Sequence, residues 1–370
     1  MKSFSFTSFF LDVYFTMTRS GFLQWGFLFA TQAVVFFVCA VLLNMNCRYN
    51  IQPQSRMNQP SSKTEKQKEH LILLWSRPFG EWFTLNQCPL AFHGDPCIFT
   101  ENKSFYHLAD AVVIHHREVS TFELLLPPSP RPEKQYWVWF NLESPNNSPN
   151  LSMMDNIFNL TMTYRADSDI FTPYGWIERH DGTELFSIPA KSKLVAWVVS
   201  NWDPNYERSK YYEELKHHIE IDLYGKYHMK LPKANQSLIL SKYKFYLSFE
   251  NSRGTDYITE KLWNNAFLSA AVPIVMGPSR ENYERFIPQD SFIHVDDFSS
   301  AQQLAAYILE LDKDDEKYQT YFRWRNVFNP KIADGWSTFY CKMCRALKDA
   351  PSYRIIPNLE KWFRTSLYSK

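Results

Sequence analysis

The fold is decided by the stretch from Tyr243 to Pro278, YKFYLSFENSRGTDYITEKLWNNAFLSAAVPIVMGP. Residues 245–249 form a short aromatic run bounded by polar residues, which predicts a buried strand. Residues 250–255 have a loop composition, and Asp256 is a suitable N-cap for a helix that begins just after it. Residues 272–276 predict the next buried strand, so the order indicates an α/β fold. The expected apolar face of the helix consists of Ile258, Leu262, Trp263, Ala266, Phe267 and Ala270.

A polar cluster is expected where the first of these strands ends. Ligands of open α/β sheets bind at this edge, beside helix N-termini whose dipole favours an anion. Lys261 can meet a phosphate as a point charge, and Glu260 can accept hydrogen bonds from a sugar diol. The competing interpretation is a solvated helix turn. There is neither Gly-x-Gly-x-x-Gly nor Gly-Lys-Ser/Thr, so neither a hydride cofactor nor a P-loop is indicated. The residues that together suit a nucleotide diphosphate are Glu250, Asn251, Tyr257, Glu260 and Lys261.

Three segments carry a resemblance to a known family: FYLSFENS (245–252), DYITEKLW (256–263) and VPIVMGPSRENYE (272–284). The chain resembles the α-1,3-fucosyltransferases of glycosyltransferase family 10, which make Lewis-type glycans, more loosely from about Leu71 to the C-terminus. The resemblance implies a GT-B fold with two Rossmann-like domains facing a cleft. It also implies inverting transfer of L-fucose from GDP-β-L-fucose to O3 of GlcNAc in type 2 N-acetyllactosamine glycans, which is Lewis x-type fucosylation.

Composition sets only broad limits. The 370 residues are 45% hydrophobic, which is enough for two domains with their own cores. The net charge of +1 gives no indication of a nucleic acid or acidic polymer as partner. Aromatic residues are common in carbohydrate-binding sites, but we expect most of the 12 Trp, 21 Tyr and 30 Phe to lie in the core.

The N-terminal region predicts a membrane anchor. Residues 21–43 are almost wholly apolar, and their length is near the ~20 residues of a membrane-spanning helix. A signal peptide is the alternative, but its apolar core would be ~7–15 residues followed by a cleavage site. Residues 1–20 would then be a cytoplasmic tail, and residues 44–68 a polar, flexible stem. The expected protein is a single-pass type II protein of the Golgi membrane, with its catalytic part in the lumen.

The sequence after the stem predicts two α/β domains and a C-terminal segment that returns to the first domain. Short apolar runs alternate with polar loops in both halves, which is typical of Rossmann-like units. A charged turn is expected at residues 312–317. The predicted strands are 71–75, 111–114, 137–140, 194–199 and 292–298, and an amphipathic helix is predicted at 300–311. The predicted divisions are an acceptor-side domain (69–185), a GDP-fucose-binding domain (186–330) and a C-terminal segment that returns to the first domain (331–370).

Glu143 is the candidate general base. It directly follows a predicted strand, where catalytic groups of α/β folds gather, and Pro145 favours an extended backbone there. A carboxylate near an acceptor hydroxyl can take its proton as the glycosidic bond forms. The alternative is an ordinary loop glutamate. The resemblance favours the base, because the family carries it in a matching Glu-Ser-Pro segment.

The resemblance also assigns acceptor-side residues. In the family, the residue after a paired His influences acceptor choice, and Arg at this position, here Arg117, goes with Galβ1-4GlcNAc. Tyr174 lies in a family block, YRADSD…PYG, and would lie between donor sugar and acceptor. Glu81 is a further acceptor-binding residue by the same resemblance. His115 and His116 have no metal-ligand spacing around them, so we expect a structural role.

On the donor side, the resemblance places Arg208 against the pyrophosphate, together with Lys261. Two fixed cations can stabilise the leaving diphosphate, so no metal or other cofactor is expected. Asp167-Ser-Asp169 has the spacing of a metal motif, and a metal site there is the alternative. A helix start is expected at Asp203-Pro204. The other residues expected to position the donor are Ser200, Asn201, Tyr246, Asn251, Tyr257 and Tyr174, with Glu260 on the ribose.

Six cysteines are present, four of them beyond the anchor region, and four cysteines allow three pairings. Cys341-x-x-Cys344 also permits a redox or zinc motif, although disulfides suit an oxidising lumen better. The resemblance favours Cys88 with Cys341 and Cys97 with Cys344. Glycosylation sequons that we expect to be usable occur at Asn102, Asn150, Asn159 and Asn235.

The expected partners are GDP-fucose and glycoprotein or glycolipid acceptors that contain N-acetyllactosamine. The sequence leaves the oligomeric state open, with a homodimer among the alternatives. Two other functions stay open: a fucosyltransferase that acts on core or protein-borne glycans, and a non-catalytic, lectin-like Golgi protein.

Overall fold

The computed structural model describes residues 69–85, 97–122, 124–180, 182, 186–333, 335–350 and 353–365. The chain divides into Met1–Glu65, which lies outside these residues, and Lys66–Lys370, to which every element below belongs. The predicted anchor (21–43) and stem (44–68) lie outside the described residues. None of the helices in the described part combines the length and the hydrophobicity of a membrane-crossing segment.

The first sheet has six parallel strands in the order β2-β1-β3-β4-β5-β6. Strand β3 is buried along its whole length, as expected for a parallel sheet that is covered on both faces. The strands are β1 (His70–Leu74), β2 (Cys97–Thr100), β3 (Ala111–His115), β4 (Tyr136–Asn141), β5 (Leu160–Thr163) and β6 (Ile170–Phe171). Short helices between them are η1 (Pro78–Gly80), η3 (Lys103–Phe105), α2 (His116–Ser120), η4 (Pro145–Asn147) and η5 (Leu151–Met154).

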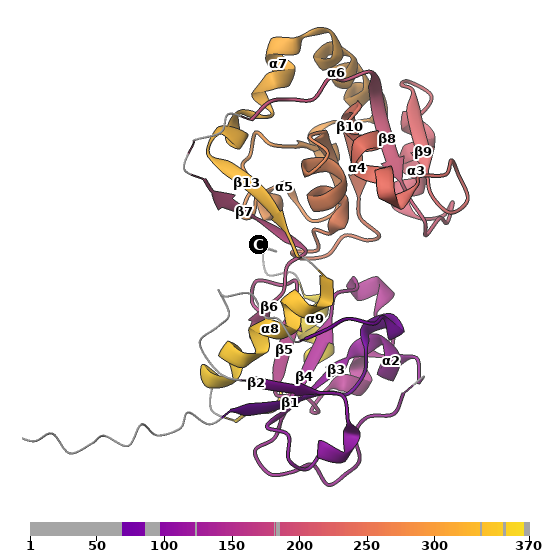
Figure 1. Ribbon diagram of the computed structural model, residues 1–370. Coiled ribbons are helices and arrows are strands. Elements are labelled where there is room, and N and C mark those ends of the chain that lie inside the picture. Colours follow the sequence, from indigo (N-terminus) through magenta and orange to yellow (C-terminus); the bar gives the residue numbers. More distant parts are fainter. Residues whose placement is uncertain are drawn as a thin grey trace, which may run out of the picture. The chain divides into compact units, whose positions relative to one another are not determined.

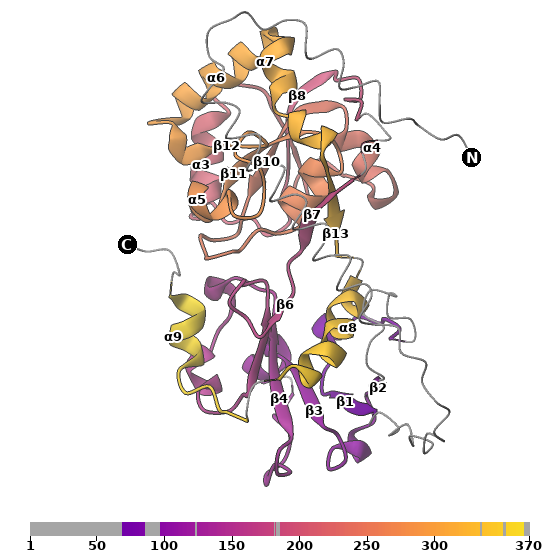
Figure 2. The same cartoon turned by 90° about the vertical axis from the view of Figure 1, so that its left-hand side faces the viewer.

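The C-terminal helices α8 (Gly335–Lys348) and α9 (Leu359–Arg364) pack on this first sheet, although they are far from it in sequence (Figures 1 and 2). Their apolar residues share one core with β1, β3, β4 and β5. A disulfide joins Cys97 at the start of β2 to Cys344 in α8, as the resemblance implied. Cys88 lies outside the described residues, so its pairing with Cys341 stays a prediction.

The second sheet has five parallel strands in the order β12-β11-β10-β8-β9. Helices α3 and α6 lie side by side along it (Figure 2). The strands are β8 (Lys193–Val198), β9 (Ile221–Tyr224), β10 (Tyr243–Phe249), β11 (Val272–Met276) and β12 (Ile293–His294), and β7 (Gly175–Arg179) pairs antiparallel with β13 (Phe328–Ile332). The helices are α3 (Glu207–Leu215), η6 (Lys233–Asn235), α4 (Gln236–Leu240), η7 (Lys261–Phe267), α5 (Arg280–Tyr283), η8 (Val295–Asp297), α6 (Ala301–Lys313), α7 (Asp315–Thr320) and η9 (Arg323–Asn326).

The helix after β10 differs from its prediction. It is the seven-residue π-helix η7, and its N-cap is Glu260 instead of Asp256. Asp256 adopts a left-handed backbone with φ of 59°, which differs from the extended conformation that is usual for an N-cap residue. Its carboxylate instead accepts hydrogen bonds from Ala166 (2.9 Å) and Asn282 (2.6 Å). Tertiary partners therefore outweigh the local capping preference.

Three other boundaries also differ. Helix α3 starts at Glu207, because residues 203–206 form a turn before it. Residues 312–317 are not a plain turn: α6 continues to Lys313 and α7 follows at once, capped by Asp314. The strand expected at 292–298 is reduced to β12.

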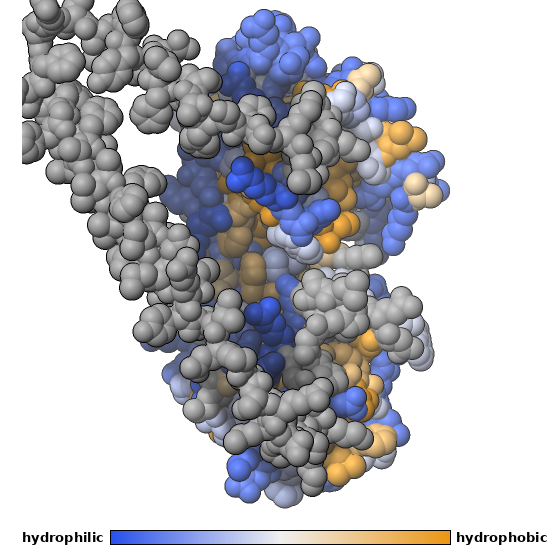
Figure 3. Space-filling view, turned by 60° about the vertical axis from the view of Figure 1, so that its left-hand side comes forward, coloured by the Kyte–Doolittle hydropathy of each residue, from blue (hydrophilic) through white to orange (hydrophobic). Residues whose placement is uncertain are grey.

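The surface is mixed in polarity. On the face shown in Figure 3, hydrophobic residues come to the surface in scattered groups between hydrophilic ones. The large aromatic side chains Trp139, Trp197 and Trp263 are fully buried, which agrees with the expectation that most aromatics serve the core.

We predict that Gly225→Ala destabilises the protein strongly. Gly225 has φ of +142°, and a Cβ there would lie 1.8 Å from the carbonyl oxygen of Val199. The conformation alone costs about 1–3 kcal/mol, and the backbone clash adds to it. Thermal unfolding should show a clearly lower Tm than for Gly182→Ala, the control, where φ is +75° and no atom of the described residues other than its chain neighbours lies within 4 Å of the added Cβ. Equal Tm values for the two variants would contradict this account.

Candidate functional site

The candidate site lies at the carboxyl edge of the second sheet. Glu250 directly follows β10, and Lys261 is the first residue of η7, which packs on the same strand. Because β10 and β11 are parallel and adjacent, the loops that follow them share one edge. Polar residues of the loop after β10 are therefore gathered where open α/β sheets hold ligands.

Lys261 is the centre of this cluster. Its ammonium is nearly buried and lies 2.8 Å from Thr259 Oγ1, 3.0 Å from Glu260 Oε1 and 3.1 Å from Glu250 Oε2. Burial opposes its charge, but Glu250 and Glu260 outweigh burial and raise the pKa of Lys261 above its ordinary value. Lys261 is therefore a fixed cation, and the interpretation as a solvated helix turn is wrong for it.

Glu250 was expected in this polar cluster, but no individual role was assigned to it from the sequence. Its side chain is wholly buried, and it accepts hydrogen bonds from the backbone N–H and the hydroxyl of Thr259, both at 2.8 Å. These contacts fix the carboxylate that holds Lys261. Its position directly after a buried strand was a signal for this role, but its partner Thr259, nine residues later, is set by the fold.

Arg208 lies in the first turn of α3 and is nearly buried. Its guanidinium donates to the carbonyl of Asn201 and to Asn251 Oδ1, and its Nη1 lies 3.5 Å from the carbonyl of Phe249. Among the described residues, its Nε has no hydrogen-bond partner. Burial lowers the pKa of Arg208, while Glu250 opposes this change. The structure thus brings Arg208, Asn251 and the end of β10 together.

Glu143 comes from the other sheet, two residues beyond the end of β4. Burial raises the pKa of Glu143 above its ordinary value, whereas the charge of Lys261 and a hydrogen bond from Asn147 act in the opposite direction. Tyr174 lies beside it, because its hydroxyl donates to the carbonyl of Leu142 at 2.7 Å. A carboxylate from the first sheet and a cation from the second therefore interact electrostatically.

The loop after β10 contacts two loops of the first sheet, one after β5 and one after β4. Asp256, in the loop before η7, accepts a hydrogen bond from Ala166 beyond β5. Gly254 packs against Pro145, and a Cβ on Gly254 would lie 3.3 Å from the Pro145 ring. The loop that carries Glu143 and the loop after β10 are therefore in direct contact.

The other residues predicted to bind the donor differ in their exposure to solvent and in their contacts. Ser200 and Asn201 follow β8 and are exposed at the same edge as Arg208. Tyr257 is buried and packs against Tyr164 with the two rings tilted and their centroids 5.0 Å apart. Tyr246 is fully buried, and its hydroxyl accepts a hydrogen bond from Asn265 at 2.9 Å. Through this hydrogen bond Tyr246 stabilises η7, and a direct contact between Tyr246 and the donor stays a prediction.

The acceptor-side candidates lie at the carboxyl edge of the first sheet. Glu81 is exposed and accepts a hydrogen bond from Trp336 Nε1 at 2.8 Å. Arg117 is exposed, and its guanidinium carbon lies 5.0 Å from the Phe79 ring centroid. His116 has a structural role, since its Nδ1 accepts from Trp139 and its Nε2 faces the carbonyl of Pro149.

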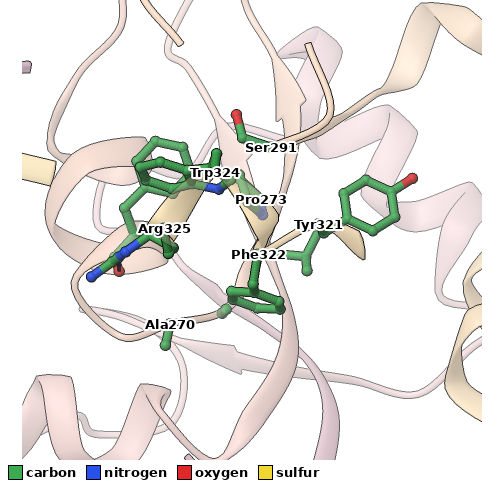
Figure 4. Close-up of a pocket in the computed structure, with 10 residues that line it drawn as sticks. Ala270, Pro273, Ser291, Tyr321, Phe322, Trp324 and Arg325 are labelled. Atoms are coloured by element: carbon green, nitrogen blue, oxygen red, sulfur yellow. Dashed lines mark hydrogen bonds between the residues drawn. The ribbon is translucent and has the colours of Figure 1, made fainter. Parts of the chain in front are cut away.

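A separate, small pocket lies at the opposite edge of the second sheet (Figure 4). Its walls are mostly apolar, and Arg325 supplies the one charged side chain among the lining residues. Burial lowers the pKa of Arg325 to about 10, and its Nη1 donates to the carbonyl of Phe267. Because the pocket is at the amino end of β11, it is not part of the cluster around Lys261.

Two family models match the chain. Residues 188–362 match the C-terminal domain of glycosyltransferase family 10 (fucosyltransferase), and residues 67–175 match the fucosyltransferase N-terminal domain. The chain is 50% identical over 318 residues to 3-galactosyl-N-acetylglucosaminide 4-alpha-L-fucosyltransferase FUT3 of Bos taurus, covering 84% of this chain and 87% of that protein. It is 46% identical over 316 residues to 4-galactosyl-N-acetylglucosaminide 3-alpha-L-fucosyltransferase FUT5 of Homo sapiens, covering 84% of each.

The chain belongs to glycosyltransferase family 10. The family implied by the three sequence segments is therefore confirmed. A solved structure, "Crystal Structure of alpha1,3-Fucosyltransferase with GDP-fucose", is similar with a TM-score of 0.53 and 19% identity, over 81% of this chain and 96% of that chain. At this identity the similarity concerns the fold, which supports an α/β fold built on parallel sheets for this family member.

The alternative metal motif of this family 10 chain is occupied by structural contacts. Asp167 accepts hydrogen bonds from Arg165 and Trp362, and Asp169 accepts from Thr161 and Arg354. Within the described ranges there is no group of three or more His, Cys, Asp or Glu side chains that could hold a metal ion. Asp167 and Asp169 therefore stabilise the loop after β5.

One predicted glycosylation site, Asn159, is buried in the structure, and its glycosylation stays a prediction. Asn159 is fully buried, and its Nδ2, the atom that would carry the glycan, donates to the carbonyl of Arg354 at 2.5 Å. Its Oδ1 accepts from the backbone N–H of Trp137. The sequon is a local triplet, whereas this burial is set by distant partners. Asn102, Asn150 and Asn235 are exposed, and their glycosylation stays a prediction.

We predict that Glu250→Gln destabilises this family 10 chain more than Glu260→Gln. Both carboxylates pair with Lys261, but the Glu250 side chain is fully buried and that of Glu260 is 49% exposed. Breaking a buried ion pair costs about 3–5 kcal/mol, and losing an exposed one costs at most about 1 kcal/mol. Chemical unfolding at neutral pH measures both values. An equal or larger loss for Glu260→Gln would contradict the role given to Glu250.

Proposed function

We propose that this chain is an inverting α-1,3-fucosyltransferase that transfers L-fucose from GDP-β-L-fucose to O3 of GlcNAc in type 2 N-acetyllactosamine glycans. The observation that carries the proposal is that the loop of Glu143 contacts, through Pro145 and Gly254, the loop that leads to the buried Lys261 cation, whose charge acts on the Glu143 carboxylate. A fixed cation suits the leaving diphosphate, and a carboxylate suits the attacking hydroxyl. Family membership supports fucose as the sugar that is transferred.

The diphosphate binds between Arg208 and Lys261. The three protons of the Lys261 ammonium are directed at Thr259, Glu250 and Glu260, so a phosphate oxygen must replace one of these partners. Glu260 is the exposed partner and the one that can swing away. It then accepts hydrogen bonds from the ribose diol, while Asn251, Ser200, Asn201, Tyr246 and Tyr257 position the nucleotide and the sugar.

The reaction is a single displacement with inversion. O3 of GlcNAc attacks the anomeric carbon, its bond to that carbon forms as the bond to the GDP oxygen breaks, and Glu143 takes the proton of the hydroxyl. Burial favours the neutral, protonated carboxyl that this step produces. Tyr174 is held beside Glu143 through Leu142 and contacts both sugars. Charge developing on GDP is stabilised by Arg208 and Lys261, so the reaction requires no divalent metal.

The cellular setting follows from the same function. Residues 21–43 anchor the protein in the Golgi membrane with residues 1–20 in the cytosol, and the catalytic part is lumenal. The disulfide between Cys97 and Cys344 suits that oxidising compartment. The two parallel sheets form the two halves of a GT-B fold, and donor and acceptor lie between Lys261 of one half and Glu81, Arg117 and Glu143 of the other.

A second acceptor class has one observation in its favour. The bovine relative is named a 4-alpha-L-fucosyltransferase of 3-galactosyl-N-acetylglucosaminides, whereas the human one is named a 3-alpha-L-fucosyltransferase of 4-galactosyl-N-acetylglucosaminides. Parallel assays with Galβ1-4GlcNAc, Galβ1-3GlcNAc and a core glycan separate these classes. We expect transfer to the first compound. Transfer to the second or third compound alone would overturn the acceptor assignment.

We predict that Glu143→Gln retains GDP-fucose binding and loses turnover by at least ~10²-fold, because the amide cannot accept the proton. Calorimetry measures binding, and release of GDP in the presence of acceptor measures turnover. Glu133→Gln, at the amino end of the same strand, is exposed and serves as control with unchanged turnover. Full turnover of Glu143→Gln would exclude Glu143 as the base.

We also predict the pH dependence. The ionised form of Glu143 is active and its pKa is raised, so kcat/KM falls on acidification at a higher pH than for an ordinary glutamate. Asn147→Ala removes a hydrogen bond that lowers this pKa, so the acidic limb moves further upward. A pH profile of both proteins measures the shift. A limb that stays in place or moves downward in the variant would contradict the assignment.

A further inference from the structure

Three loops converge at the carboxyl edge of the first sheet. Strand β3 lies between β1 and β4, and all three run parallel. The turn η1 follows β1, His115 ends β3, and Glu143 follows β4. His115 pairs in register with Phe140, three residues before Glu143. Residues of η1 and α2 are therefore close to the proposed base along the same sheet edge.

Phe79 in η1 has an unusual conformation. Its φ and ψ are 55° and 20°, in the left-handed region that non-glycine residues rarely adopt. Its side chain is nevertheless 41% exposed, so no core packing explains the conformation. Such strain persists only where surrounding contacts enforce it, and it is concentrated at ligand-binding positions.

The contact that enforces this conformation is a buried carboxylate. Glu118 Oε1 accepts the backbone N–H of Phe79 at 2.9 Å, and its Oε2 lies 2.6 Å from His115 Nδ1. Burial opposes ionisation, but the hydrogen bonds from His115 and Phe79 outweigh it and lower the pKa of Glu118. Glu118 thus connects the strained turn to the end of β3.

The Phe79 ring is also held by its neighbours. Its centroid lies 5.4 Å from that of His115 and 5.9 Å from that of Trp336, and the Arg117 guanidinium carbon is 5.0 Å away. Trp336 in turn donates to Glu81. A single exposed aromatic ring is common on protein surfaces. The Phe79 ring, in contrast, is fixed on several sides, and its strained backbone is held by a buried carboxylate. This arrangement is typical of a side chain that binds a ligand.

We propose that Phe79 is the stacking platform for a pyranose ring of the acceptor and that Glu118 is its positioning residue. The proposal rests on the fucosyltransferase function above and adds how the acceptor is held. An aromatic face binds the apolar C–H face of a sugar and leaves its hydroxyls free for polar groups such as Glu81. Arg117 then influences acceptor choice through the ring on which it packs.

The test separates acceptor binding from every donor step. Phe79→Leu keeps apolar bulk without an aromatic face, and Phe79→Tyr keeps the face. We expect Phe79→Leu to raise the KM for Galβ1-4GlcNAc about 3- to 10-fold and Phe79→Tyr to leave it near that of the unaltered protein. The KM for GDP-fucose and the slow hydrolysis of GDP-fucose by water should stay unchanged. Phe105→Ala removes a ring of equal exposure (40%) in η3 and serves as control.

Glu118→Asp tests the positioning role. The shorter side chain cannot reach both His115 and Phe79, so the same selective rise in acceptor KM is expected. The acceptor KM of the double variant, Glu118→Asp with Phe79→Leu, should be no higher than that of Phe79→Leu alone, because both substitutions remove the same interaction. Fully additive effects, or equal changes in both KM values, would overturn the positioning role even if Tm falls.

The outcomes distinguish this proposal from the proposed function. If the unaltered protein transfers fucose and Phe79→Leu leaves the acceptor KM unchanged, only the platform is wrong. If the unaltered protein transfers no fucose to any acceptor, the function is wrong as well. Saturation-transfer NMR with Galβ1-4GlcNAc and GDP then decides the platform independently, because loss of sugar contact in Phe79→Leu supports it and an unchanged signal overturns it.

Discussion

The structure of the donor side depends on one buried ion pair, Lys261 with Glu250. An unpaired ammonium could not remain charged where Lys261 lies, and Glu250 supplies the compensating charge from the end of β10. Thr259 fixes the carboxylate by two hydrogen bonds. The ammonium is therefore preorganised, so a ligand that needs a positive charge at this sheet edge meets one whose position requires no rearrangement of the backbone.

The same constraint explains how the two sheets act together. Glu250 and Glu260 bring two negative charges to the two positive charges of Lys261 and Arg208, so this group of four side chains is close to neutral. Under the proposed function, a bound diphosphate adds negative charge and makes ionisation of Glu143 less favourable, since the charges of Lys261 and Glu260 already act on its pKa. The contact between Gly254 and Pro145 keeps the loop of Glu143 next to the loop after β10.

The sequence was most informative where structure is local. Short apolar runs gave the strands around β3, β4, β10 and β11 nearly to the residue, because burial on both faces leaves little ambiguity. It was least informative where a partner is distant. The side chain of Asp256 could cap a helix but accepts hydrogen bonds from Ala166 and Asn282 instead. Asn159 begins a sequon, but its side chain is buried and hydrogen-bonded to Trp137 and Arg354. The partners of Asp256 and Asn159 cannot be recognised from the residues that neighbour them in sequence.

The same limit explains which site residues were missed. Glu143, Arg208 and Lys261 follow strands or begin helices, so their positions and a family resemblance were sufficient to single them out. Phe79 lies in η1 and Glu118 in α2, and neither residue type is unusual in such short helices. Only their contact shows a buried carboxylate that stabilises a left-handed phenylalanine whose ring stays exposed. Because such strain lowers stability and serves no core packing, its persistence is best explained by a ligand that uses the ring.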